Sequence, residues 1–97
     1  MKPAERQQWI LDYVRRHQAA AGSTRYTVDV LNAYFVADYI DATGAKCDVM
    51  PYGADKCPQL GRDLSALHAD MKLRRHSTGI QGMGGMGFPR WAWSYYL

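Results

Sequence analysis

Basic side chains that could neutralise phosphate gather in one segment of the sequence, residues 56–76. This segment has a net charge of +3, from Lys56, Arg62, Lys72, Arg74 and Arg75 against Asp63 and Asp70. Segment 23–55 has a net charge of −3, from Arg25 and Lys46 against Asp29, Asp38, Asp41, Asp48 and Asp55. Lysine and arginine bind the phosphates of nucleic acids, whereas an acidic surface repels them. We therefore expect the two segments to face different partners.

A glycine-rich stretch, Gly82-Met-Gly84-Gly-Met-Gly87, matches the G-x-G-x-x-G pattern of dinucleotide-binding sites. That pattern binds a pyrophosphate where it opens a helix, but here Phe88-Pro89-Arg90 and a strand pattern follow. The sequence therefore favours a glycine-rich loop between two strands, without a bound nucleotide. Met83 and Met86 suit adaptable contacts with DNA or with a protein, or they pack on the aromatic strand that follows.

Cysteine and histidine residues give little support to metal binding or catalysis. Cys47 and Cys57 lack the C-x-x-C spacing of zinc and redox sites, so two reduced thiols in or near the core are the favoured interpretation. A metal shared by Cys57, His68 and His76 is the alternative. The three histidines, His17, His68 and His76, are scattered along the sequence, and no Ser-His-acid spacing is present. We predict no cofactor, no metal and no enzymatic activity.

Two helices are predicted in the first half of the chain. The first covers 3–21, between Pro3 and Gly22, and its apolar stripe is Trp9, Ile10, Tyr13, Val14 and His17. After a short extended link at Arg25-Tyr26, the second covers 28–43, with Thr27 as N-cap and Thr43-Gly44 as its end. Its predicted buried stripe is Val28, Leu31, Tyr34, Phe35 and Tyr39 or Ile40, and its exposed side carries Asp38 and Asp41.

A third helix and two strands are predicted in the second half. The helix covers 58–73, with the apolar stripe Leu60, Leu64, Leu67 and Met71 and the outward residues Gln59, Arg62, Ser65, Ala66 and Ala69. Gly61 inside it predicts close packing. The strands cover 74–81 and 90–96, and the second places Trp91, Trp93 and Tyr95 on one face. These rings either cover the core or stack on unpaired bases. Trp9 and Tyr13 either pack beneath them or form the seam of a dimer.

The whole chain, residues 1–97, has the length of one domain. Its 47% hydrophobic and 22% charged residues are typical of a globular protein. No apolar run is long enough to cross a bilayer, and the first residues lack the apolar core of a secretory signal. We expect a cytoplasmic protein, associated with the nucleoid if it binds DNA, with no membrane partner and with a loop at 45–56.

The segment Pro58-Gln-Leu-Gly-Arg-Asp-Leu-Ser-Ala-Leu67, followed by Lys72-Leu-Arg-Arg75 and two strands, resembles the winged helix-turn-helix domain. The likeness covers nearly the whole chain and extends to small uncharacterised phage and prophage regulators. It implies an α+β fold of three helices followed by a C-terminal two-stranded wing. Asp70-Met71 stands where many members have a glycine. The resemblance also implies that helix 58–73 enters the major groove of DNA and that the wing covers an adjacent groove.

Two functions are expected from this resemblance and from the charge pattern. The first is double-stranded DNA binding by a small regulator of transcription or of phage or mobile-element functions, acting by site occupancy as a homodimer. Its DNA contacts would be Lys56, Gln59, Arg62, Ser65, Ala66, Lys72, Arg74, Arg75, His76 and Arg90. The alternative is a winged-helix scaffold that binds a protein, as a host-protein inhibitor or adaptor. Its contacts would be Trp9, Tyr13, Asp38, Asp41, Met83 and Met86.

Overall fold

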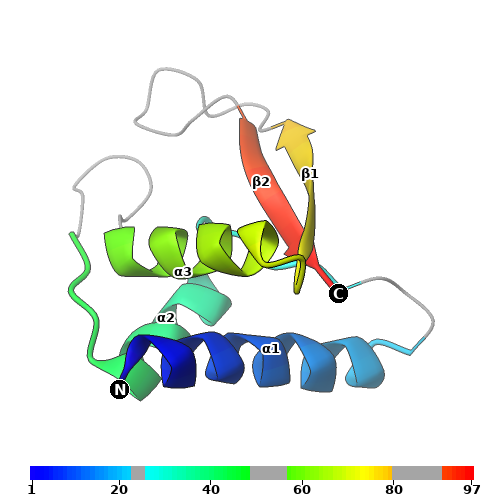
Figure 1. Cartoon of the computed structure of the whole chain (residues 1–97). Coiled ribbons are helices and arrows are strands. Elements are labelled where there is room, and N and C mark those ends of the chain that lie inside the picture. Colours follow the sequence, from blue (N-terminus) through cyan, green and yellow to red (C-terminus); the bar gives the residue numbers. More distant parts are fainter. Residues whose placement is uncertain (23–25, 49–56, 80–90) are drawn as a thin grey trace.

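The chain folds as three helices followed by a two-stranded antiparallel sheet, the α+β arrangement predicted from the sequence. The computed structural model describes residues 1–22, 26–48, 57–79 and 91–97. In chain order the elements are α1 (Pro3–Ala20), α2 (Ala33–Thr43), α3 (Pro58–Ala69), β1 (Arg74–Gly79) and β2 (Trp91–Tyr96). In Figure 1, α3 lies over α1, and the sheet stands at the C-terminal end of α3. No helix in these described ranges is long and apolar enough to cross a membrane.

α1 follows its prediction closely. Pro3 occupies its first turn, where a missing N–H costs nothing, and the Glu5 carboxylate accepts a hydrogen bond from the Lys2 backbone N–H at 3.2 Å. Gly22, just beyond the helix, adopts a φ of 73°, a left-handed conformation that glycine takes without strain. The buried face of α1 consists of Ile10, Leu11, Tyr13 and Val14.

α2 begins five residues later than predicted, at Ala33 rather than at 28. Asn32, not Thr27, is the N-cap, because its side-chain oxygen accepts the Phe35 backbone N–H at 3.1 Å. Val28 is extended instead: its N–H donates to the Tyr95 carbonyl at 2.9 Å, and the Tyr95 N–H returns a bond at 2.8 Å. This single antiparallel bridge gives β2 a second neighbour besides β1.

Tyr34 was predicted to be buried and is instead 84% exposed. Because α2 starts late, Val28 and Leu31 are not on the helix, and the buried stripe is Phe35, Val36 and Tyr39. Tyr34 lies beside that stripe and points to solvent. The predicted end of the helix at Thr43-Gly44 is confirmed, since Gly44 has a φ of 71° and its N–H donates to the Ile40 carbonyl.

α3 ends at Ala69, four residues before its predicted end. Met71 adopts a φ of 62°, the left-handed conformation that glycine favours at this position. The N–H groups of Met71 and Lys72 donate back to the carbonyls of His68 and Leu67 at 3.0 and 2.9 Å. This turn removes Met71 from the apolar stripe, and the side chain predicted to be buried is 91% exposed.

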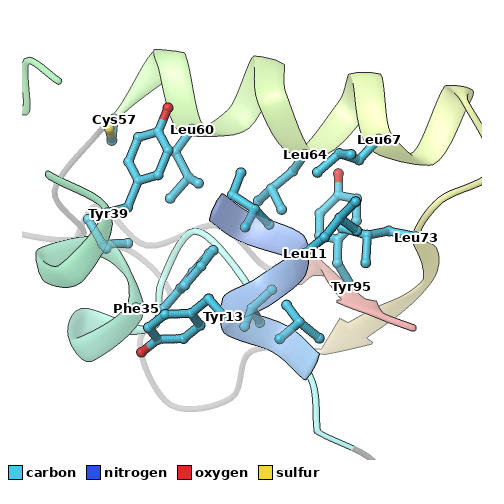
Figure 2. Packing of buried hydrophobic residues seen from close by; sticks show 14 residues of the cluster. Leu11, Tyr13, Phe35, Tyr39, Cys57, Leu60, Leu64, Leu67, Leu73 and Tyr95 are labelled. Atoms are coloured by element: carbon cyan, nitrogen blue, oxygen red, sulfur yellow. The ribbon is translucent and has the colours of Figure 1, made fainter. Parts of the chain in front are cut away.

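The core lies between α1 and α3, and α2 and β2 close its sides (Figure 2). Leucines from α3 point toward α1, with Phe35 and Tyr39 at one end and Leu73 and Tyr95 at the other. The sheet pairs Arg74 with Tyr96 and continues to Gly79 with Trp91. The predicted strand ends at 80, 81 and 90 lie outside the described residues, as does most of the predicted 45–56 loop.

Candidate nucleic-acid interface

The outward face of α3 presents Arg62 and Ser65 to solvent, as predicted. Ala66 is half-buried at the side of this face. Gln59 is also half-buried, and its side-chain amide donates to the Tyr39 hydroxyl at 3.0 Å. Arg62 and Ser65 can therefore contact a ligand directly, whereas the Gln59 amide is held against α2.

Gln59 belongs to a polar network that joins all three helices. Arg6 of α1 donates two hydrogen bonds to the buried Asp63 carboxylate of α3, from Nε at 2.9 Å and from Nη2 at 3.2 Å. The Tyr39 hydroxyl of α2 donates to the same carboxylate at 2.6 Å. Every charged or polar group of this cluster thus has a partner, which a buried carboxylate requires.

This network changes the acid–base behaviour of its members. Burial, reinforced by the hydrogen bond to Asp63, raises the pKa of Tyr39 to about 12. The hydrogen bond to Asp63 likewise raises the pKa of Arg6. The phenol and the guanidinium both keep their protons at neutral pH, so both can donate hydrogen bonds to the Asp63 carboxylate.

The sequence prediction missed this cluster, although one signal for it was present. Asp63 lies between Leu60 and Leu64 on the apolar face of α3, where a carboxylate needs a buried cationic or hydroxyl partner. Which residue supplies that partner depends on how α1 and α2 pack against α3. The sequence of α3 alone therefore does not identify Arg6 and Tyr39 as the partners.

Predicted phosphate-binding residues of β1 lie on both faces of the sheet. Arg74 and His76 are exposed on one face, where the His76 ring lies 5.5 Å from the Tyr96 ring. Arg75 lies on the other face, half-buried, with its guanidinium carbon 4.1 Å from the centre of the Trp93 ring. Lys72 is exposed in the turn before β1. The structure therefore brings Arg75, but not Arg74 or His76, onto the aromatic face of the sheet.

A groove of about 650 Å³ separates α3 from β2. We call it the tryptophan groove; its lining residues are Val30, Pro58, Gly61, Arg62, Ser65, Trp91, Ala92, Trp93 and Tyr95. Close packing at Gly61, predicted from the sequence, is wrong: a Cβ added there would meet nothing within 4 Å. The predicted aromatic face divides along its length, with Tyr95 in the core, Trp93 half-buried and Trp91 51% exposed.

The predicted protein-contact residues fall into two groups. Tyr13 is 4% exposed in the core, and Trp9 is partly buried against it; the ring centre of Phe35 lies 5.2 Å from that of Tyr13 and 6.4 Å from that of Trp9, so both rings pack against α2. Asp38 and Asp41 are exposed on α2, as predicted, and Asp38 accepts a hydrogen bond from the Tyr13 hydroxyl at 2.9 Å. That bond makes Asp38 partly structural and leaves Asp41 as the freer carboxylate.

Four predicted contact residues, Lys56, Met83, Met86 and Arg90, lie outside the described residues, as does the glycine pattern between Gly82 and Gly87. Within the described ranges, no group of three or more His, Cys, Asp or Glu side chains could hold a metal ion. Cys57 is buried in the core, and the His68 ring donates to the Leu73 carbonyl at 3.2 Å.

No protein-family model, no curated protein and no solved structure matches the chain. Function has to be inferred from the chemistry of the described residues.

Proposed function

We propose that the chain binds double-stranded DNA through α3 and the β1–β2 sheet, as a small regulator of transcription or of phage or mobile-element functions that acts by occupying its site. The order of elements and the Val28–Tyr95 bridge fit the resemblance to winged helix-turn-helix domains. In this proposal Arg62 and Ser65 contact base edges or phosphates from α3, and Lys72 and Arg74 bind phosphates.

The observation that carries the proposal is the neutralisation of Asp63 from inside the fold. The described part of this region, 57–79, holds four cations, Arg62, Lys72, Arg74 and Arg75, against Asp63 and Asp70. Arg6 pairs with Asp63 from α1, so only Asp70 remains to offset those cations. Among described residues, the ion pairs are Arg6–Asp63 and Arg15–Asp12, and neither uses a cation of α3 or β1. Arg62, Lys72 and Arg74 therefore remain available to phosphate, whereas Arg75 is half-buried against Trp93.

Salt dependence tests the proposal directly. Fluorescence anisotropy of a short mixed-sequence duplex, measured between about 50 and 200 mM salt, should give an affinity that falls steeply with salt. The double variant Lys72→Ala with Arg74→Ala should reduce the slope of log affinity against log salt by about two. The matched control removes two exposed arginines of α1, Arg15 and Arg16, and should leave that slope unchanged. Equal slopes for the two double variants would contradict the assigned face.

A second candidate function, protein binding on the winged-helix scaffold, is favoured by the surface of α2. The 84% exposed ring of Tyr34 lies one helical turn from Asp38 and two turns from Asp41, so an aromatic group and two carboxylates share one side of the helix. Such a surface suits a basic protein partner and repels DNA. A photo-crosslinking residue at position 34 should join a protein in cells under this proposal, whereas one at position 72 should join DNA under the first.

A further inference from the structure

The indole of Trp91 is an aromatic surface that is exposed in the described part of the structure. Trp91 and Trp93 meet edge to face, with ring centres 5.1 Å apart and an angle of 85° between their planes. The Arg75 guanidinium covers Trp93 at 4.1 Å, so Trp93 is held in place. Trp91, 51% exposed at the rim of the tryptophan groove, is the ring with a surface available for stacking.

The positive charge of Arg62 and the apolar lining together indicate which class of ligand the tryptophan groove can bind. Among the described residues that line it, Arg62 carries a positive charge, none carries a carboxylate, and most of the other side chains are apolar. A purely apolar partner would bury the Arg62 charge without compensation, which costs free energy. A planar ring that carries a negative group satisfies both features, because the ring stacks on indole and the anion pairs with arginine.

We propose that the tryptophan groove binds one unpaired nucleobase of DNA, stacked on Trp91, with the adjoining phosphate held by Arg62. This inference rests on the proposed DNA binding and specifies the form of DNA that is preferred. In a paired duplex the faces of the bases are covered by their neighbours, so only an extruded or single-stranded nucleotide can stack in this way. At about 650 Å³, the groove is within the size range of pockets that hold small molecules.

The test compares three DNA ligands by fluorescence anisotropy: a matched duplex, the same duplex with one unpaired bulged nucleotide, and the corresponding single strand. The bulged duplex should bind more tightly than the matched one. Trp91→Leu, which keeps an apolar side chain and removes the ring, should lower affinity for the bulged duplex by about tenfold or more, and affinity for the matched duplex much less. Trp91→Phe should retain most of the preference, because a phenyl ring still stacks.

Tyr34→Ala is the matched control, since it removes another exposed aromatic ring from α2, away from the groove. It should leave the preference unchanged, and far-ultraviolet circular dichroism should show every variant folded. Equal binding of bulged and matched duplexes, or a preference that persists in Trp91→Leu, overturns the base-stacking inference and leaves duplex binding standing. If none of the three ligands binds at low salt, both this inference and the proposed function are refuted.

Discussion

Breaking the Arg6–Asp63 pair should destabilise the protein more than any exposed charge substitution. The Arg6 and Asp63 side chains are only 16% and 4% exposed. Arg6→Ala leaves the Asp63 carboxylate buried, and among described residues the Tyr39 hydroxyl still donates to it. Removing one partner of a buried pair costs about 3–5 kcal/mol. For a domain with a total stability of about 5–15 kcal/mol, that is a large fraction.

The structure also predicts how the loss can be recovered. In the double variant Arg6→Met with Asp63→Leu, no buried charge remains, and apolar packing replaces the pair. The free energy of unfolding of this double variant should be closer to the native value than the free energy of unfolding of Arg6→Ala is. Other buried ion pairs that were replaced by apolar groups behave in this way. Tyr39 then loses its acceptor, so the recovery is incomplete by about 1 kcal/mol.

Urea unfolding followed by far-ultraviolet circular dichroism measures these differences. The internal control is the exposed pair Arg15–Asp12, whose side chains are 61% and 52% exposed. Arg15→Ala should cost less than about 1 kcal/mol, and high salt should erase most of that effect. If Arg6→Ala proves as mild as Arg15→Ala, the pair does not hold the three helices together and the reasoning is refuted.

Three smaller changes test other parts of the fold. Met71→Gly should raise the free energy of unfolding by about 1 kcal/mol in urea titrations, because glycine adopts a φ of 62° without strain. Asn32→Ala should lower it by about 1 kcal/mol, since the Phe35 N–H at the start of α2 loses its acceptor; an unchanged midpoint would contradict the assigned cap. Raising the pH from about 10 to about 12 should lower the free energy of unfolding, because folding raises the pKa of Tyr39 and so favours its neutral phenol. In urea titrations at several pH values, Tyr39→Phe should show a smaller loss of free energy over this range.

Local patterns predicted the elements whose determinants are local. The leucines of α3 and the buried face of α1 follow from helical spacing, and the end of α2 follows from Gly44. The start of α2 could not be placed in the same way, because Thr27 and Asn32 both have side chains suited to an N-cap. What decides between them is the pairing of Val28 with Tyr95, a contact between distant parts of the sequence.

The candidate site shows the same division. Exposure of Arg62 and Ser65 was predictable from the phase of α3, since they lie opposite its leucines. The positions of Gln59 and Arg75 were not, because each depends on an aromatic residue from another element, Tyr39 or Trp93. The periodicity of a helix or strand predicts which side chains face outward, but it does not predict which of them bind a residue of a neighbouring element.

The place of β2 between β1 and Val28 has a consequence for the kinetics of folding. β1 directly precedes β2 among the elements of the chain, whereas Val28 lies more than sixty residues before Tyr95, so the pairing of β2 with β1 is the more local of the two. The Val28–Tyr95 bridge closes a much longer loop than the β1–β2 pairing does, and that closure costs more conformational entropy. Docking of the β1–β2 pair on Val28 is therefore the step that should limit the folding rate.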